Sequence, residues 1–210
     1  MSVLTMILGQ SGTGKSTSMR NLDPNKVLLI QAVRKALPYR SAEWKPLTSE
    51  GGSIYVCDDS KKICDIMRKS SREIIILDDS QYIMSNEFMR RGKEKGYDKF
   101  TDIGLNYWNI IDTAASLDDN KRVYILSHTE ESETGITKLK TIGKMLDDKI
   151  TMEGLATIVM QTIVSDGQYA FITRNNGKNT VKTPMGLFGS EYIENDLKAV
   201  DDAICEYFSI

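Results

Sequence analysis

The stretch VLTMILGQSGTGKST, residues 3–17, joins an apolar run to a glycine-rich turn. The run 3–8 is short and apolar almost throughout, which is typical of a buried parallel strand. Gly9 to Ser16 then fits the pattern G-x-x-x-x-G-K-[ST], and the segment GKSTSMRNL that follows predicts a helix. Strand, turn and helix in this order predict the first unit of an α/β fold.

Each residue type in this turn has a physical role in holding phosphate. Glycines let the chain turn so tightly that successive N–H groups face an anion, and the start of the helix adds partial positive charge. Lys15 is expected to reach the β- and γ-phosphates of ATP, and the Ser16 hydroxyl to bind Mg²⁺. The alternative is a glycine-rich turn without a ligand. The predicted nucleotide contacts are Gly9, Gln10, Ser11, Gly12, Thr13, Gly14, Lys15, Ser16 and Thr17.

A second candidate strand, EIIILDD at 73–79, is apolar and then abruptly acidic. A parallel strand that ends in Asp points a carboxylate at the crevice beyond the carboxyl ends of the sheet. Asp78 is therefore predicted to hold Mg²⁺ through water. Asp79 is a candidate to accept a proton from an attacking water, or alternatively to cap the next helix. Gln81 is a further candidate to orient that water.

His128, the only histidine, ends the candidate strand RVYILSH at 122–128. This strand is expected beside the Asp78 strand, which would place His128 near the terminal phosphate. We predict that it senses this phosphate and passes the signal to the segment that follows. The alternative is a purely structural histidine.

Three lysines, Lys138, Lys140 and Lys144, crowd into the polar connection at 130–153. Strong phosphoryl-transfer catalysis usually needs a cation beyond the one in the loop, often supplied by another subunit. Lys140 or Lys144 is therefore predicted to enter the nucleotide site of a neighbouring copy, which makes the protein a homo-oligomer. The alternatives are a solvated basic loop, or a loop that contacts nucleic acid.

The stretch EFMRRGKEKGYDKF at 87–100 mixes basic residues with aromatic ones. Cations for phosphates and rings for bases are what single-stranded nucleic acid requires. The alternative is the solvated end of a helix, with Glu87, Glu94 and Asp98 offsetting the charge. The predicted DNA contacts are Arg90, Arg91, Lys93 and Lys95.

Strands alternate with amphipathic helices along the rest of the chain. This pattern predicts an α/β fold with a mostly parallel sheet that is covered on both faces, and one domain over 1–210. Two strands around Asp166-Gly167 predict a C-terminal antiparallel hairpin. A last helix is predicted over 195–208, capped by Asn195 or Asp196.

The composition excludes several classes of protein. A net charge of −2 argues against a surface coated in positive potential, so nucleic acid would have to bind a local patch. No apolar run reaches the length of a membrane helix, and the N-terminus lacks the basic region of a signal peptide. Three cysteines without a C-x-x-C pair suggest free thiols in a reducing cytoplasm.

With these motifs in order, the chain resembles the short RecA-like core ATPases of bacteriophages, which include the Sak-four group of single-strand annealing recombinases. The resemblance rests on GQSGTGKST, LDDSQYIMSNEFMRRGKEKGYDKF, YILSHTE, KTIGKMLDDKITMEG and FITRNNGKNTVKTPMGLF. It implies a P-loop NTPase with a RecA-like core. It also implies ATP-dependent action on single-stranded DNA, by annealing or strand pairing, in phage recombination or replication. The implied setting is the bacterial host cytoplasm, with a single-strand-binding protein as partner.

One departure concerns the second strand. RecA places a catalytic Glu after it, whereas this chain has LLIQAVRKALPYR at 28–40 with no acid. This favours Asp79 as the base, or slow hydrolysis. The same segment offers Arg34, Lys35 and Arg40 for contacts with ribose or phosphate.

Two other functions compete with a DNA-linked ATPase. A small-molecule kinase needs an arginine-rich lid over its substrates, and residues 130–145 contain no arginine. A nucleotide-bound scaffold or loader with little turnover is compatible with the missing glutamate.

Overall fold

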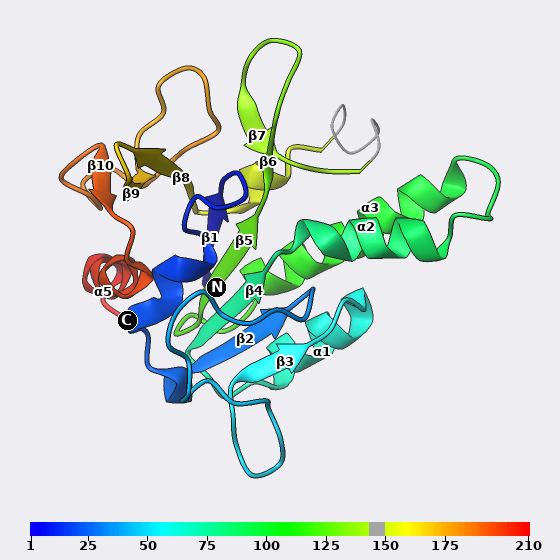
Figure 1. The fold of residues 1–210 in the computed structure, drawn as a ribbon, viewed down its shortest axis with the longest axis horizontal. Helices are drawn as coiled ribbons and strands as arrows, with labels where there is room; N and C mark the ends of the chain where they lie inside the picture. The colour runs from blue at the N-terminus through cyan, green and yellow to red at the C-terminus, as the bar shows by residue number, and fades with distance from the viewer. Residues whose placement is uncertain (143–149) are drawn as a thin grey trace.

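The structure is a computed structural model that describes residues 1–142 and 150–210. An eight-stranded sheet has the order β10-β9-β8-β1-β5-β4-β2-β3, and β6 and β7 form a separate two-stranded sheet (Figure 1). The strands are β1 Val3–Leu8, β2 Val27–Gln31, β3 Ile54–Val56, β4 Ile74–Asp78, β5 Arg122–Ser127, β6 Thr129–Glu131, β7 Thr137–Leu139, β8 Ile158–Ser165, β9 Gln168–Ile172 and β10 Tyr192–Glu194.

The large sheet is parallel from β8 to β3, and antiparallel where β9 and β10 extend it. The predicted parallel sheet and the predicted hairpin around Asp166-Gly167 are therefore confirmed. Two features were not predicted from the sequence: the short edge strand β10, and the hairpin β6–β7 inside the polar connection. Neither carries the apolar run or alternation that marks a buried strand.

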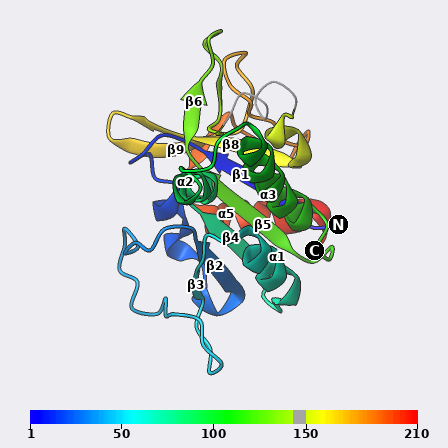
Figure 2. The same cartoon turned by 90° about the vertical axis from the view of Figure 1, so that its right-hand side faces the viewer.

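Helices cover both faces of the sheet (Figures 1 and 2). One face carries α1 (Ser60–Lys69), α2 (Gln81–Arg90) and α3 (Asp98–Ala115); the other carries α5 (Leu197–Phe208) and the 3₁₀ helix η1 (Ser16–Asn21). Further short 3₁₀ helices are η2 (Pro24–Lys26), which precedes β2, and η3 (Met152–Leu155), which precedes β8. Asp196 caps α5 by accepting a hydrogen bond from the Lys198 N–H at 2.9 Å, as predicted.

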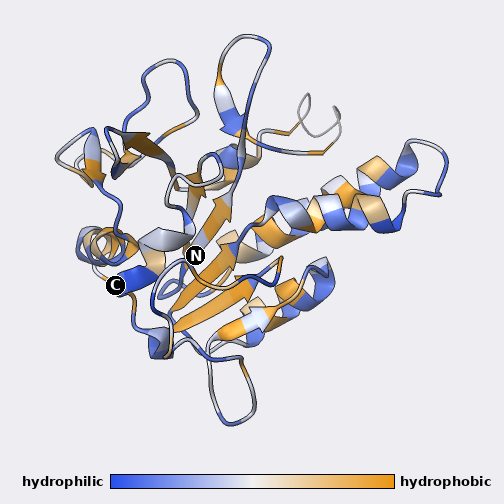
Figure 3. Ribbon diagram, in the orientation of Figure 1, coloured by the Kyte–Doolittle hydropathy of each residue, from blue (hydrophilic) through white to orange (hydrophobic). Residues whose placement is uncertain are grey.

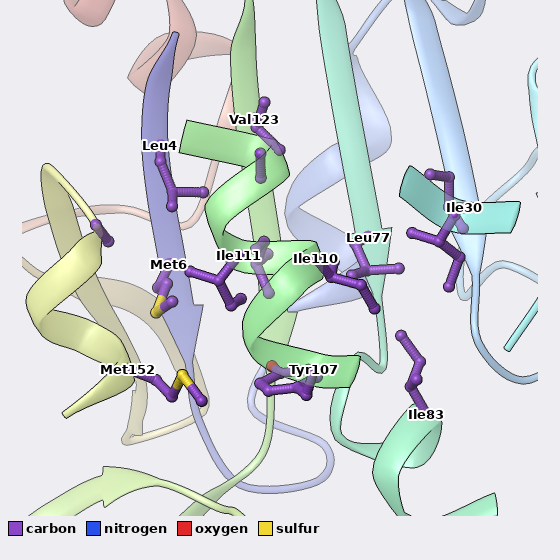
Figure 4. Close-up of a cluster of buried hydrophobic side chains, with 14 of the residues drawn as sticks. Leu4, Met6, Ile30, Leu77, Ile83, Tyr107, Ile110, Ile111, Val123 and Met152 are labelled. Atoms are coloured by element: carbon purple, nitrogen blue, oxygen red, sulfur yellow. The ribbon is translucent and has the colours of Figure 1, made fainter. Parts of the chain in front are cut away.

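Alternate residues of each central strand face opposite layers, which divides the core into two clusters. Leu4 and Met6 of β1 pack under α3, whereas Val3 and Ile7 face α5 and η1. In Figure 4 the α3 residues Tyr107, Ile110 and Ile111 point at the strands. All three are fully buried, and burying each contributes about 1.5–3 kcal/mol. Figure 3 shows the central strands as the hydrophobic part of the ribbon.

The helix predicted after Gly14 is a short 3₁₀ helix rather than an α-helix. Its residues Ser16, Thr17, Ser18 and Asn21 have low helix propensity because their side chains compete for main-chain groups. Ser18 Oγ does so here, donating to the Lys15 carbonyl at 2.6 Å.

The strand order positions the site. Strand β5 pairs with both β1 and β4, so the ends of three parallel strands meet at one edge of the sheet. The prediction that the His128 strand lies beside the Asp78 strand is confirmed. None of the helices in the two described ranges has the length and apolar character needed to cross a membrane.

Candidate active site

The glycine-rich loop after β1 has the geometry that its sequence demands. Gly12 and Gly14 have φ values of +78° and +92°, a region that favours glycine. Gly9 is fixed by its neighbour instead, since a Cβ there would lie 1.8 Å from Thr162 Oγ1 on β8. Thr162 Oγ1 also lies 2.6 Å from Thr13 Oγ1, so β8 and the loop are built against each other.

Unpaired main-chain amides line this loop. Within residues 1–142 and 150–210, the N–H groups of Gly12, Gly14 and Lys15 find no hydrogen-bond partner, although Gly14 and Lys15 are buried residues. Buried amides are almost always paired, so these three suit an anion or water.

Lys15 folds back over the loop. Its Nζ donates to the carbonyl oxygens of Gly9 and Gln10, both at 2.8 Å. Burial lowers the pKa of Lys15 to about 8, although the carboxylates of Asp79 and Asp78 oppose the shift. A buried ammonium held only by neutral carbonyls is poised to bind a stronger acceptor such as phosphate.

Ser16 and Asp78 meet across the cavity. Ser16 Oγ lies 3.0 Å from each carboxylate oxygen of Asp78. Burial, and then the adjacent Asp79, raises the pKa of Asp78 to about 6. A hydroxyl beside one buried carboxylate fits Mg²⁺, which typically takes one or two carboxylates and completes its shell with water and phosphate oxygens. No cluster of three His, Cys, Asp or Glu residues occurs in the described part of the chain, so the protein alone would not saturate the ion.

Asp79 follows β4 with a φ of +57°, in the left-handed region. Its carboxylate pairs with the Lys35 ammonium and lies 3.5 Å from His128 Nε2. The alternative that Asp79 caps α2 is not supported, because Ser80 occupies the cap position and makes no side-chain cap bond. Burial, followed by the ammonium of Lys15, lowers the pKa of His128, so its imidazole is neutral at pH 7.

Gln81, the first residue of α2, is buried behind the strand ends. Its Oε1 accepts hydrogen bonds from Ser127 Oγ at 3.3 Å and from the His128 N–H at 3.2 Å. The amide oxygen predicted to orient water is therefore engaged with the end of β5. This geometry assigns Gln81 to the positioning of His128.

The side chains of Lys15, Ser16, Asp78, Asp79 and His128 line one cavity of about 250 Å³, whereas Gln81 does not line it. Of the three basic residues offered by segment 28–40, only Lys35 lines it. Several lining residues were not predicted from the sequence, among them Tyr169 of β9, which packs against Gly14, and the pair Leu37 and Pro38. No local signal marks Tyr169, because only the fold brings the hairpin to the loop. The cavity is lined by Ser11, Gly12, Gly14, Lys15, Ser16, Thr17, Gln31, Lys35, Ala36, Leu37, Pro38, Asp78, Asp79, His128 and Tyr169.

The lysine segment is tied to this site by its main chain. The Lys140 N–H donates to the His128 carbonyl at 2.9 Å, and the Lys140 side chain is exposed. Lys138 on β7 pairs with Glu130 on β6 at 3.4 Å. Lys144 lies outside the described residues. The role of these lysines in a neighbouring copy stays a prediction.

The basic residues at the end of α2 are partly neutralised within the chain. Arg90 pairs with Asp58 at 2.6 Å, and Arg91 contacts Glu87, Glu94 and Asp102. These contacts favour a structural role for Arg91. In the residues that the structure covers, Lys93 and Lys95 form no ion pair; both are exposed, as is Tyr97 at 88%.

Compared with models of known protein families and with curated proteins, the chain shows no match. The cavity lies at the carboxyl edge of the parallel strands. It brings together a glycine-rich loop with free amides, two ammonium groups, two carboxylates and a neutral imidazole.

Proposed function

We propose that this chain is an ATPase, with a P-loop and a RecA-like core, that binds ATP together with Mg²⁺. One observation carries the proposal: Lys15, the Ser16–Asp78 pair and the Asp79–His128 pair line the same cavity beside unpaired loop amides. Such a cavity offers separate groups for the phosphates, the metal ion and the attacking water.

In this proposal, the loop amides and Lys15 hold the β- and γ-phosphates. Lys15 exchanges its two carbonyl acceptors for phosphate oxygens, which form stronger, charge-assisted hydrogen bonds. Ser16 and Asp78 hold the magnesium ion, which neutralises charge on the phosphates when bound. Asp78 must be ionised for this, which its pKa of about 6 permits at pH 7.

Asp79 and His128 are the groups for hydrolysis. The Asp79 carboxylate can accept a proton from water in the cavity, and the neutral imidazole of His128 lies 3.5 Å away to orient that water. Gln81 fixes the main chain of His128 and so keeps this pair in place.

We further propose that the protein acts as an oligomer on single-stranded DNA in phage recombination or replication, as the family resemblance implies. The exposed tip between α2 and α3 supports this, because Lys93, Lys95 and Tyr97 offer cations and a ring to a single strand. Lys140 supports the oligomer, since its main-chain N–H donates to the His128 carbonyl while its side chain is exposed.

A nucleotide-bound scaffold or loader with little turnover is a second candidate. One observation favours it: the Asp79 carboxylate is already engaged by the Lys35 ammonium, which leaves it less accessible to an attacking water. Under this alternative the protein binds ATP but seldom hydrolyses the nucleotide. The bound ATP then shapes a surface for partner proteins.

The test combines binding with turnover. ATP and ADP affinities are measured with Mg²⁺, and phosphate release is then followed with and without a single-stranded oligonucleotide. Release that rises with the oligonucleotide supports the DNA-linked ATPase, whereas tight binding without release supports the scaffold. A protein that ignores ATP at millimolar concentration contradicts both. Mass measurement with a non-hydrolysable ATP analogue reports the oligomer.

A further inference from the structure

Lys35 brings a second ammonium group into the nucleotide cavity. It lies four residues beyond the end of β2, where the Gln31 amide donates to the Lys35 carbonyl at 3.2 Å. Its Nζ pairs with Asp79 and lies 5.3 Å from the centre of the Tyr82 ring. The main chain of Lys35 is therefore anchored at the cavity, and its ammonium points at the residues expected around the terminal phosphate.

The ion pair is asymmetric in its burial. The Lys35 side chain is 50% exposed, whereas that of Asp79 is 9% exposed. Burial is the largest single influence on the pKa of Lys35 and lowers it, but the hydrogen bond and charge of Asp79, with the charges of Tyr82 and Asp78, together outweigh it. The net pKa is therefore raised, and Lys35 is charged at pH 7. Exposed lysines keep a flexible stem, so this charge can move while Asp79 stays fixed.

The charges in the cavity change when ATP enters. Lys15 and Lys35 balance Asp78 and Asp79 in the structure as described. ATP with one Mg²⁺ brings about two further negative charges, concentrated on the terminal phosphates. Among the cavity-lining residues, Lys35 is the charged cation that is not already held by the loop.

We propose that Lys35 is a second phosphate-binding cation, supplied by the same chain, that leaves Asp79 to bind the terminal phosphate of ATP. The inference rests on the proposed function and goes beyond it. Lys35 would give the site a second cation that does not come from a neighbouring copy. Its movement would also explain how the Asp79 carboxylate is paired before ATP binds and is available to accept a proton from water afterwards. The ligand class is a nucleoside triphosphate, because a diphosphate lacks the group that Lys35 contacts.

Removing Lys35 alone would be ambiguous, because an unpaired Asp79 would itself repel phosphate. The experiment therefore compares Asp79→Asn with the double variant Asp79→Asn/Lys35→Met, and measures ATP and ADP affinities with Mg²⁺. We expect the double variant to bind ATP about 10- to 100-fold more weakly than Asp79→Asn, as for a lost charged hydrogen bond, and ADP within about threefold. Lys45→Met, in the same background, is the matched control, because Lys45 is exposed and does not line the cavity.

The outcomes separate this proposal from the proposed function. If Asp79→Asn and the double variant bind ATP equally well, Lys35 only neutralises Asp79 and the inference is wrong. If the unmodified protein binds no ATP, the proposed function fails and takes the inference with it. Far-ultraviolet circular dichroism confirms that each variant is folded.

A second measurement needs no variant. An ATP analogue that carries an acyl group on its terminal phosphate transfers this group to a neutral lysine amine in contact with that phosphate, which forms an amide on the lysine and releases ATP. Mass spectrometry of the labelled protein should find the acyl group on Lys35, and excess ATP should suppress the labelling. Acylation of Lys15 without any at Lys35 contradicts the inference.

Discussion

The loop 9–16 and the segment 35–38 both contribute residues to the same cavity but are held in different ways. The loop is fixed by its main chain: two glycines with positive φ, a glycine against Thr162, and a lysine folded onto carbonyls. The segment is held at Lys35 by one hydrogen bond from Gln31 and by an ion pair with Asp79. The first arrangement suits constant grip on phosphate. The second arrangement suits an exchange of binding partners at Lys35, because side-chain contacts can be replaced without refolding the chain.

The largest expected effect tests the loop directly. Lys15→Met keeps the length of the stem but removes the ammonium, and should weaken ATP binding by about 100-fold, because charged hydrogen bonds to phosphate are lost. Isothermal titration with ATP and Mg²⁺ measures it. Lys45→Met, on the exposed surface, is the control. If the variant binds ATP within about threefold of the unmodified protein, Lys15 does not bind phosphate and the contrast between the loop and the Lys35 segment fails.

Gly9→Ala tests whether the loop depends on its packing against β8. The new Cβ would lie 1.8 Å from Thr162 Oγ1, so the loop or the strand must move. We expect a loss of about 1–3 kcal/mol in the free energy of unfolding, as for other overpacked sites. Urea denaturation measures it, and adding Thr162→Ala should restore part of the loss. No rescue by the second change would indicate another cause.

Asp78→Asn should separate stability from function. Since the pKa of Asp78 is raised to about 6, the folded protein resists ionising it and loses stability as the pH rises through this range. The variant should therefore gain about 3 kcal/mol in the free energy of unfolding at pH 7 without nucleotide, and this gain should shrink towards pH 4. Mg²⁺-dependent ATP binding should be lost. An equal gain at both pH values contradicts this assignment.

The lowered pKa of Lys15 predicts a pH dependence of ATP binding. Lys15 is charged below its pKa of about 8, and above it the free protein must first take up a proton. Affinity should therefore fall by up to about tenfold per pH unit above 8, since each unit costs about 1.4 kcal/mol. Lys15→Arg, which stays charged, should lose this slope. The same slope in both proteins would assign it to another group.

The smallest effect concerns the second region. Pro38→Gly gives the segment near Lys35 more conformational freedom in the unfolded and unliganded states. Ordering this segment then costs about 0.4–1 kcal/mol more free energy. The preference for ATP over ADP should fall by about two- to fivefold, while ADP affinity stays unchanged. Competition binding measures both ligands. A fall in both affinities would mean that the segment supports the loop as a whole.

The sequence predicted the loop, the Asp78 strand and the position of His128, because each depends on a local pattern and on the tendency of parallel strands to share one edge. It did not predict that Lys35 pairs with Asp79, or that Gln81 holds the main chain of His128. These contacts join residues that are 44 and 47 positions apart. No periodicity encodes such pairs, since they arise only when the strands have assembled.

The hairpin β6–β7 starts where β5 ends and returns to it through the bond between Lys140 and His128. Its distal turn, residues 132–136, projects away from the sheet (Figure 1). The base of the hairpin is thus joined to a residue that contacts Asp79, and the turn lies at the far end of the hairpin. A small rotation of His128 at the cavity would therefore displace the distal turn of the hairpin by a larger distance. A change inside the cavity would in this way alter the outer surface of the molecule.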